Sequence, residues 1–170
     1  MRAWTFEEVR SLATGSDDEI AAGAIEALQT EDGDVRAEAC RLLARLSDIE
    51  ARLRTTLQTD PRLALEAVVF LRQESLLGDV AALIRESPDA SVRGRAAQIT
   101  GLLGGKQFET EVAAALLDPS PRVRALAAAG LGALGSGTAL DALRAAWSRE
   151  SDAGARVVMT QVLDDCGALP

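Results

Sequence analysis

The chain has 170 residues, of which 26 are acidic and 18 basic, and it contains no histidine and no tyrosine. Without histidine, the protein cannot use imidazole in acid–base catalysis or as a ligand of zinc or iron. The net charge of −8 argues against nucleic acid as a partner, because basic surfaces supply most of that affinity. No apolar run is long enough for a membrane span or a signal peptide, so we expect a cytoplasmic protein without a membrane partner.

The first expected helix covers residues 4–13, and Thr5 and Glu8 have the spacing of a capping box at its start. Five later stretches each begin with Asp or Ser, which are favoured N-cap residues, and continue with an apolar stripe of helical period. Their spacings are 28, 29, 31 and 32 residues. The five N-cap positions are Asp32, Asp60, Asp89, Ser120 and Asp152.

Shorter amphipathic segments lie between these helices, and none shows the alternation typical of strands. They cover residues 17–28, 48–57, 76–85, 107–117 and 138–147. The prediction is an all-α fold of about eleven helices. A helix pair of about 30 residues cannot bury both of its apolar faces alone, so stacked pairs in an α-solenoid are favoured over a globular bundle. We expect one domain over 1–170, with a cap helix in 1–16 and five pairs in 17–167.

The two ends of the stack leave two interpretations open. Trp4, Phe6 and Val9 either fold back as a cap on the first pair or expose an apolar edge that joins two copies. Little of the sequence remains after the last helix to cover its end. The sequence therefore does not fix the oligomeric state.

One capped turn resembles a known family. The run Leu-Leu-Asp-Pro-Ser-Pro-Arg-Val-Arg at 116–124, followed by Ala127 and two Leu-Gly pairs, is similar to the short HEAT-like repeat of phycobilisome lyases and bacterial scaffold proteins. Residues 87–93 and 31–36 are further copies. The resemblance implies a right-handed α-solenoid in which the motif Asp and Arg form a ladder of hydrogen bonds between repeats and the Val anchors each helix.

The resemblance also assigns residues to this ladder. It implies ladder arginines at Arg36, Arg93, Arg124 and Arg156, and an acidic partner at Asp118. The second repeat departs from the pattern because Ala64 stands where the arginine is expected, which puts the continuity of the ladder in doubt there. The last repeat has Ala155 in place of the valine.

No pattern of catalytic residues is found. The acidic clusters near residues 17 and 31 lie at expected helix starts, where carboxylates cap free N–H groups. Serines have no histidine partner for a triad. Cys40 and Cys166 are interpreted as free, buried thiols that behave as small hydrophobic residues. We therefore expect no enzyme activity, no metal and no cofactor.

The expected function is a non-catalytic scaffold or adaptor that binds a protein or peptide, because solenoids present extended concave surfaces. Two alternatives stay open. A chromophore lyase or isomerase of the phycobilin-lyase type would show a new visible absorbance band with chromophore. A HEAT-like DNA-binding protein or DNA glycosylase would show a salt-dependent gel shift, although the acidic charge disfavours it.

The expected binding surface is the face of each repeat helix opposite its apolar stripe, five, nine and twelve residues past the cap. Few charges occur there, which favours a groove for a partner helix. An alternative is that tight packing leaves no room for long side chains on this face. The contact residues expected in the groove are Arg41, Leu65, Val69, Arg72, Gln98, Ala129 and Gln161.

Overall fold

The computed structural model describes residues 3–169, and within this range every regular element is helical. The prediction of an all-α fold with eleven α-helices is therefore confirmed for the described residues. The α-helices are α1 (Phe6–Ser11), α2 (Asp17–Ala27), α3 (Gly33–Leu43), α4 (Ile49–Thr59), α5 (Pro61–Phe70), α6 (Leu77–Glu86), α7 (Ala90–Leu102), α8 (Glu109–Ala114), α9 (Pro121–Leu134), α10 (Gly137–Trp147) and α11 (Ala153–Asp165). Short 3-10 turns are η1 (Leu12–Thr14), η2 (Glu74–Leu76), η3 (Lys106–Phe108) and η4 (Ala115–Leu117).

The chain divides into two compact units, Met1–Leu76 and Leu77–Pro170. The expectation of one repeat domain over the whole chain stays a prediction beside this division. The helices that follow the five predicted N-caps, which we call the motif helices, are α3 and α5 in the first unit and α7, α9 and α11 in the second.

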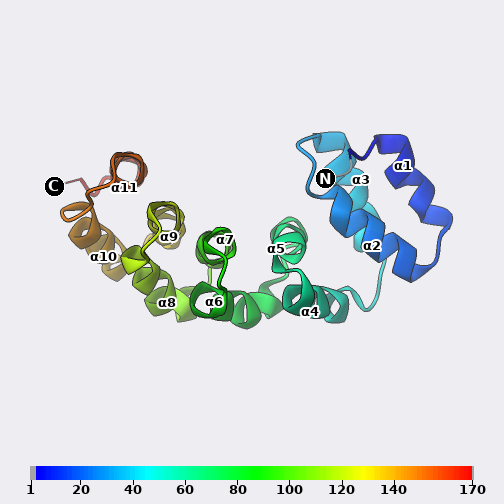
Figure 1. Cartoon of the computed structure of the whole chain (residues 1–170), viewed down its shortest axis with the longest axis horizontal. Helices are drawn as coiled ribbons and strands as arrows, with labels where there is room; N and C mark the ends of the chain where they lie inside the picture. The colour runs from blue at the N-terminus through cyan, green and yellow to red at the C-terminus, as the bar shows by residue number, and fades with distance from the viewer. Residues whose placement is uncertain (1–2, 170) are drawn as a thin grey trace. The chain divides into compact units, whose positions relative to one another are not determined.

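In the first unit, α1 packs on α3 and on α2 (Figure 1). The capping box is formed, because the Thr5 hydroxyl accepts from the backbone of Glu8 while the Glu8 carboxylate accepts from the backbone of Thr5. Val9 is fully buried, and Leu12 lies so close to Gly23 of α2 that a Cβ there would be 2.7 Å from its Cδ1. The N-terminal residues thus fold back on the first pair, as one of the two interpretations predicts.

The two motif helices of the first unit pack mainly on helices of the other kind. Helix α3 contacts α2 and α1, and α5 contacts α4 and α2. The buried side chains of these contacts are aliphatic. They include Ile25, Leu28, Val35, Leu43, Leu53 and Val68.

In the second unit, the helices alternate between two layers (Figure 1). Helices α6, α8 and α10 form one layer, and the motif helices α7, α9 and α11 form the other. Each motif helix packs on the next one, α7 on α9 and α9 on α11. This is the packing of consecutive helix pairs that the repeat predicts.

Glycine allows the close approach of α7 and α9. A Cβ on Gly101 would lie 2.0 Å from the carbonyl oxygen of Gly130, and a Cβ on Gly130 would lie 2.5 Å from the carbonyl oxygen of Ala97. No side chain fits at these two positions without moving backbone. A similar relation holds at the next step, where a Cβ on Gly132 would lie 2.3 Å from Cγ1 of Val162 on α11.

In four of the five repeats, the residue three positions after the cap anchors its motif helix. Val35, Val92 and Val123 are at most 2% exposed, as the resemblance implies, and Ala155 in the last repeat is also 2% exposed. In the second repeat this residue is Leu63, which is only half-buried. Among the helices of residues 3–169, none combines the length and the apolar character needed to cross a bilayer.

Candidate functional site

The capped turns before the motif helices contain the polar residues that the repeat conserves along this chain. Asp32, Asp60, Asp89 and Asp152 each accept a hydrogen bond from a backbone N–H in the first turn of the following helix. Ser120 is the exception, because its side chain makes no capping hydrogen bond. The prediction of side-chain caps is thus wrong at Ser120, where Pro121 follows and Asp118 accepts from the Ser120 backbone N–H instead.

The first rung of the ladder joins α7 to the turn before α9. Arg93 donates from Nε to Oδ2 of Asp118 at 2.8 Å and from Nη2 to Oδ1 at 3.0 Å. Its Nη1 donates to the backbone carbonyls of Ser87 and Pro88, both at 3.1 Å. A guanidinium fork bound to both oxygens of one carboxylate fixes the orientation of both groups. The rung therefore ties the start of one motif helix to the start of the next.

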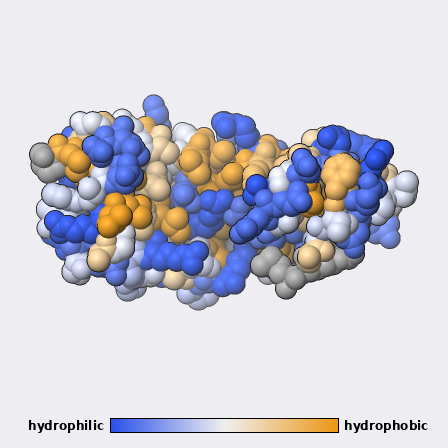
Figure 2. Space-filling view, turned by 90° about the horizontal axis from the view of Figure 1, so that it is seen from above, coloured by the Kyte–Doolittle hydropathy of each residue, from blue (hydrophilic) through white to orange (hydrophobic). Residues whose placement is uncertain are grey.

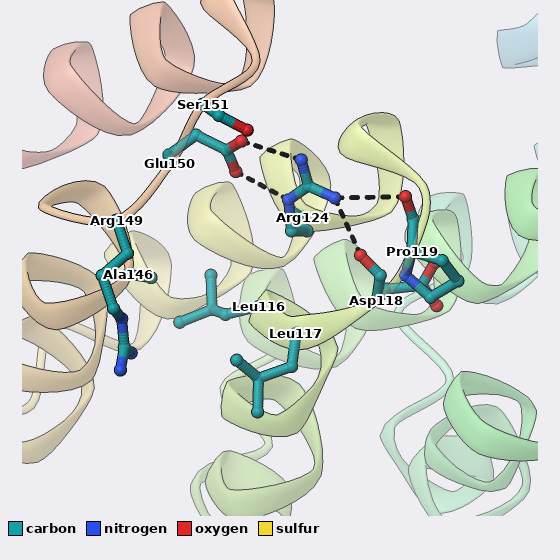
Figure 3. A pocket seen from close by; sticks show the side chains of 9 residues that line it. All are labelled: Leu116, Leu117, Asp118, Pro119, Arg124, Ala146, Arg149, Glu150 and Ser151. Carbon is teal, nitrogen blue, oxygen red and sulfur yellow. Dashed lines mark hydrogen bonds and ion pairs between the residues drawn. The ribbon is translucent and has the colours of Figure 1, made fainter.

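The second rung repeats this geometry one step along the unit (Figure 3). Arg124 donates from Nε to Oε2 of Glu150 at 2.6 Å and from Nη2 to Oε1 at 2.7 Å. Its Nη1 donates to the carbonyl oxygens of Asp118 and Pro119. The Glu150 side chain is only 3% exposed, so this pair is the most enclosed of the ion pairs described.

Each ladder acid also holds its own capped turn. Asp118 accepts from the backbone N–H of Ser120, and Glu150 accepts from that of Asp152, both at 2.8 Å. Hydrogen bonds from Arg124 lower the pKa of Glu150 to about 2, and those from Arg93 lower the pKa of Asp118. Both carboxylates are therefore charged at neutral pH and serve as acceptors in the fold.

Sequence reasoning missed Glu150. Its signal was positional, because Glu150 lies two residues before the Asp152 cap, as Asp118 lies two residues before Ser120. The same position is Gln58 before Asp60 and Ser87 before Asp89. Those two side chains have no negative charge, so the sequence offers a ladder acid only in the last two turns.

The remaining predicted ladder arginines have aromatic partners. The guanidinium of Arg36 lies over Phe70 at 5.3 Å from the ring centroid. That of Arg156 lies over Trp147 at 4.8 Å, and its Nη1 donates to the Glu150 carbonyl. Neither forms an ion pair with an acid among residues 3–169, so the hydrogen bond to an acid of the next repeat that the resemblance implies is not formed at either position.

A pocket of about 460 Å³ lies beside the second rung, between η4 and the turn after α10. Figure 3 shows the Arg124–Glu150 pair along one side of it and Leu116 and Leu117 along another. Leu117 is 76% exposed, and Arg149 points away from the pair. The polar atoms of the rung that face this pocket bond one another.

The predicted contact residues of the first unit do not share one environment. Leu65 is 1% exposed and packs in the core, so it cannot touch a partner, and its place in the predicted surface is corrected. Val69 is half-buried, whereas Arg41 and Arg72 are exposed. Arg41 pairs with Glu38. Arg72, at φ 50°, lies just after α5, and its Nη2 is 3.5 Å from Oε1 of Glu74.

In the second unit, the predicted face is partly covered by the neighbouring motif helix. Gly94 and Gly101 are buried, and a Cβ on Gly94 would lie 2.8 Å from Cδ1 of Leu126. The small residues five and twelve positions past the cap are thus explained by packing, as the alternative interpretation predicts. Gln98, Ala129 and Gln161, nine positions past the cap, are the predicted contact residues here that are not buried.

The accessible face of the second unit is turned by about 60° around the motif helices from the predicted face. It comprises the positions two, six, nine and thirteen residues past the cap, none of which is buried. We call this set the open stripe. It consists of Ser91, Arg95, Gln98, Leu102, Arg122, Leu126, Ala129, Ala133, Gly154, Val158, Gln161 and Asp165.

The open stripe is poor in charge for an accessible helix face. Only Arg95, Arg122 and Asp165 are charged among its twelve residues, and Leu102 is 48% exposed. Figure 2, which looks down on the layer of motif helices, shows hydrophobic side chains between the charged ones on this side of the second unit. An accessible face of this composition is suited to contact with another protein.

The two cysteines differ from the prediction in their exposure. Both are free, but Cys166 is exposed and Cys40 is half-buried. Cys166 follows α11, and its Sγ lies 3.8 Å from the carbonyl oxygen of Gly132. Its place on the predicted apolar stripe of the last repeat does not bury it. Burial raises the pKa of Cys40. In the described part of the chain, no three acidic or cysteine side chains gather as a metal site would require.

Comparison with known proteins agrees with this geometry. A family model described as HEAT repeats matches residues 77–164, which are 88 of the 170 residues. The match covers almost all of the second unit, including both ladder rungs and α7, α9 and α11. It concerns HEAT repeats as a class and does not indicate the phycobilisome-lyase type. No curated protein matches the sequence.

Proposed function

Because the chain belongs to the HEAT-repeat family, whose all-α solenoid fold its consecutive helix pairs share, we propose that it is a non-catalytic protein-interaction scaffold. HEAT repeats generally bind other proteins through extended helical surfaces. The proposed contact surface is the open stripe of the second unit, on α7, α9 and α11. The proposed ligand is a helix or peptide of another protein.

The composition of the open stripe is the observation that carries this proposal. Leu102, Leu126 and Val158 are apolar residues that are accessible or half-buried, one on each of the three motif helices. Gln98 and Gln161 supply hydrogen-bonding groups between them. An amphipathic helix lies in such a surface through apolar residues spaced three and four apart, and the two arginines of the stripe favour acidic groups on the ligand.

The enclosed polar groups of the unit support a scaffold over an enzyme. The carboxylates of Asp118 and Glu150 are held by arginines and backbone N–H groups, so neither is placed to move a proton. The sequence has no histidine to act in their stead. The fold thus uses its buried charges to align repeats, and the accessible side chains are suited to binding.

The first unit enters this proposal only through accessible predicted contacts. Arg41, Val69 and Arg72 remain candidates there, whereas Leu65 does not. Val69→Glu tests whether the first unit takes part, because Val69 is half-buried on α5.

Affinity capture with the purified chain, followed by mass spectrometry, tests the function. Ala129→Glu is expected to remove the captured protein without lowering the melting temperature, because Gln98 already holds a long polar side chain at the equivalent position of α7. Ala145→Glu is the matched control, since Ala145 is exposed on α10 in the other layer. Capture that survives Ala129→Glu, or is lost equally with Ala145→Glu, contradicts the open stripe as the contact surface.

A further inference from the structure

The last motif helix has a face that its two predecessors use to receive another helix. On α7 and α9, the receiving positions lie five, eight and twelve residues past the cap, as the close approaches of Gly94, Ala97 and Gly101 to α9 and of Gly132 to α11 show. All three on α7, and all three on α9, are Gly or Ala. The equivalent positions of α11 are Val157, Thr160 and Asp164.

This face of α11 is hollowed and accessible. A pocket of about 450 Å³ is lined by Ala153, Arg156, Val157, Thr160 and Gln161. Val157 is 68% exposed, although it lies in the first half of α11 and valine is usually buried. No element of the second unit covers the pocket within the residues that the structure describes.

Arg156 is held in the orientation of a ladder arginine. Its Nη1 donates to the Glu150 carbonyl at 3.0 Å, as Nη1 of Arg124 donates to the Asp118 carbonyl at 2.9 Å. Its guanidinium rests on Trp147, whose Nε1 donates to the Thr160 hydroxyl at 2.9 Å. The Arg156 guanidinium is therefore positioned by the Trp147 ring against its face and by the Glu150 carbonyl at one edge.

The other edge of this guanidinium is open. In Arg93 and Arg124, Nε and Nη2 bind both oxygens of a carboxylate. In Arg156, the same two atoms have no acceptor within residues 3–169, and no acid there pairs with it. A preoriented fork whose two N–H groups point outward is complementary to a carboxylate.

We propose that Arg156 and the adjoining pocket bind a partner protein through an Asp or Glu that immediately precedes a helix. The carboxylate would complete the rung on Nε and Nη2, and the first turn of the partner helix would cover Val157. This site is separate from the centre of the open stripe. It rests on the proposed function only in that both make the chain a protein-binding module.

The first helices of a second copy of this chain offer no acid at the position that could complete the rung on Arg156. Their caps are Thr5 and Ser16, and the residues two positions earlier are Ala3 and Thr14, which have no negative charge. Besides, Val157 and Asp164 are larger than the glycines at these positions of α7, so a helix cannot approach α11 as closely as α9 approaches α7. The site is therefore suited to a separate, dissociable partner.

A synthetic peptide copying residues 148–165 is a defined probe, because it contains Glu150 and the helix that follows it. Fluorescence anisotropy with the full chain is expected to show binding below roughly 1 mM. Arg156→Gln should weaken it by about tenfold or more, since a charged bidentate contact is lost. A peptide with Gln in place of Glu150 should show the same loss, and Arg156→Lys should be intermediate because an ammonium lacks the fork.

Arg149→Gln is the control, because Arg149 is an exposed arginine of the preceding turn that lies outside this pocket. It should bind the peptide as the unchanged protein does. Equal binding by Arg156→Gln, or no binding by the unchanged protein, overturns the proposal. A dimer in light scattering that Arg156→Gln dissociates would also overturn it, since the occupant would then be a second copy. The peptide variant keeps the test valid if a protein variant folds poorly, and Ala129→Glu tests the open stripe separately.

Discussion

The two units of the chain use the same repeat in different ways. In the second unit, each motif helix packs on the next motif helix, whereas in the first unit α3 and α5 pack mainly on α1, α2 and α4. Gly101 and Gly130 allow backbone contact between α7 and α9. The residue equivalent to Gly130, ten positions past the cap, is Leu42 in α3 and Phe70 in α5. Side chains of that size forbid such an approach.

The polar contacts differ in the same way. The motif helices of the second unit are joined by two arginine–carboxylate rungs, whereas in the first unit Arg36 of α3 lies over Phe70 of α5. At the next step, Ala64 and Ser87 stand where an arginine and an acid would form a rung. Close packing and the ladder therefore occur together in the second unit, whose turns also contain the two ladder acids, Asp118 and Glu150.

The largest expected effect comes from filling the glycine contact of the second unit. Gly101→Ala places a Cβ against the backbone of Gly130, so helices α7 and α9 must separate. We expect a loss of about 3 kcal/mol in the free energy of unfolding, measured by urea denaturation. Gly33→Ala in the first unit is the control, because a Cβ there meets nothing within 4 Å. A comparable loss in both variants would show that packing does not distinguish the units.

Removing an arginine should cost more in the second unit than in the first. Arg124→Ala leaves the enclosed Glu150 without its fork, and we expect a loss of about 2 kcal/mol. Arg36→Ala removes a cation–π contact and should cost about 0.5–1 kcal/mol. Denaturant midpoints of the two variants give the comparison. If Arg124→Ala unfolds at the midpoint of the unchanged protein, the ladder does not stabilise the fold.

Acid should weaken the second rung. The pKa of Glu150 is lowered from 4.5 to about 2 in the folded chain, so its contribution is complete above pH 4.5 and is lost as the pH falls toward 2. By linkage, we expect about 2 kcal/mol of this contribution to be lost between pH 7 and pH 3. Thermal melts should show this slope in the unchanged protein and a shallower slope in Glu150→Gln. Equal slopes would contradict the lowered pKa.

The smallest effect separates the two kinds of cap. Asp89→Ala removes the acceptor of a backbone N–H and should cost about 1 kcal/mol. Ser120→Ala should change the melting temperature little, because the Ser120 side chain makes no capping bond. Asp32→Ala in the first unit should resemble Asp89→Ala, since Asp32 accepts from two N–H groups. An effect of Ser120→Ala as large as that of Asp89→Ala would contradict this distinction.

Helix positions and caps were predictable because they depend on neighbours in the sequence. Asp89 starts a helix through its own turn, and Val92 marks the buried side three residues later, whatever the tertiary contacts. Glu150 was predictable in principle from its place two residues before a cap, but a single acid at that position is common in any turn. Its role becomes evident only when Arg124 is seen to reach it.

The orientation of the accessible face was not predictable from one helix alone. An apolar stripe identifies the side that faces its pair, but the side opposite is divided between solvent and the next repeat. Gly101 and Leu65 are uncharged, as the residues of the predicted groove are expected to be, and yet both are buried. Which of the small residues are covered depends on the separation of motif helices, which is set by contacts some 30 residues apart in the chain.

The double role of the ladder acids has a consequence for dynamics. Glu150 accepts from Arg124 of one repeat and from the backbone of Asp152 in the next, so the turn before α11 cannot open without releasing α9. Asp118 links α7 to α9 in the same manner. The backbone amides of these three helices should therefore exchange with deuterium as one cooperative block. Amides of the first unit, which has no such bond between its motif helices, are expected to exchange in smaller, independent groups.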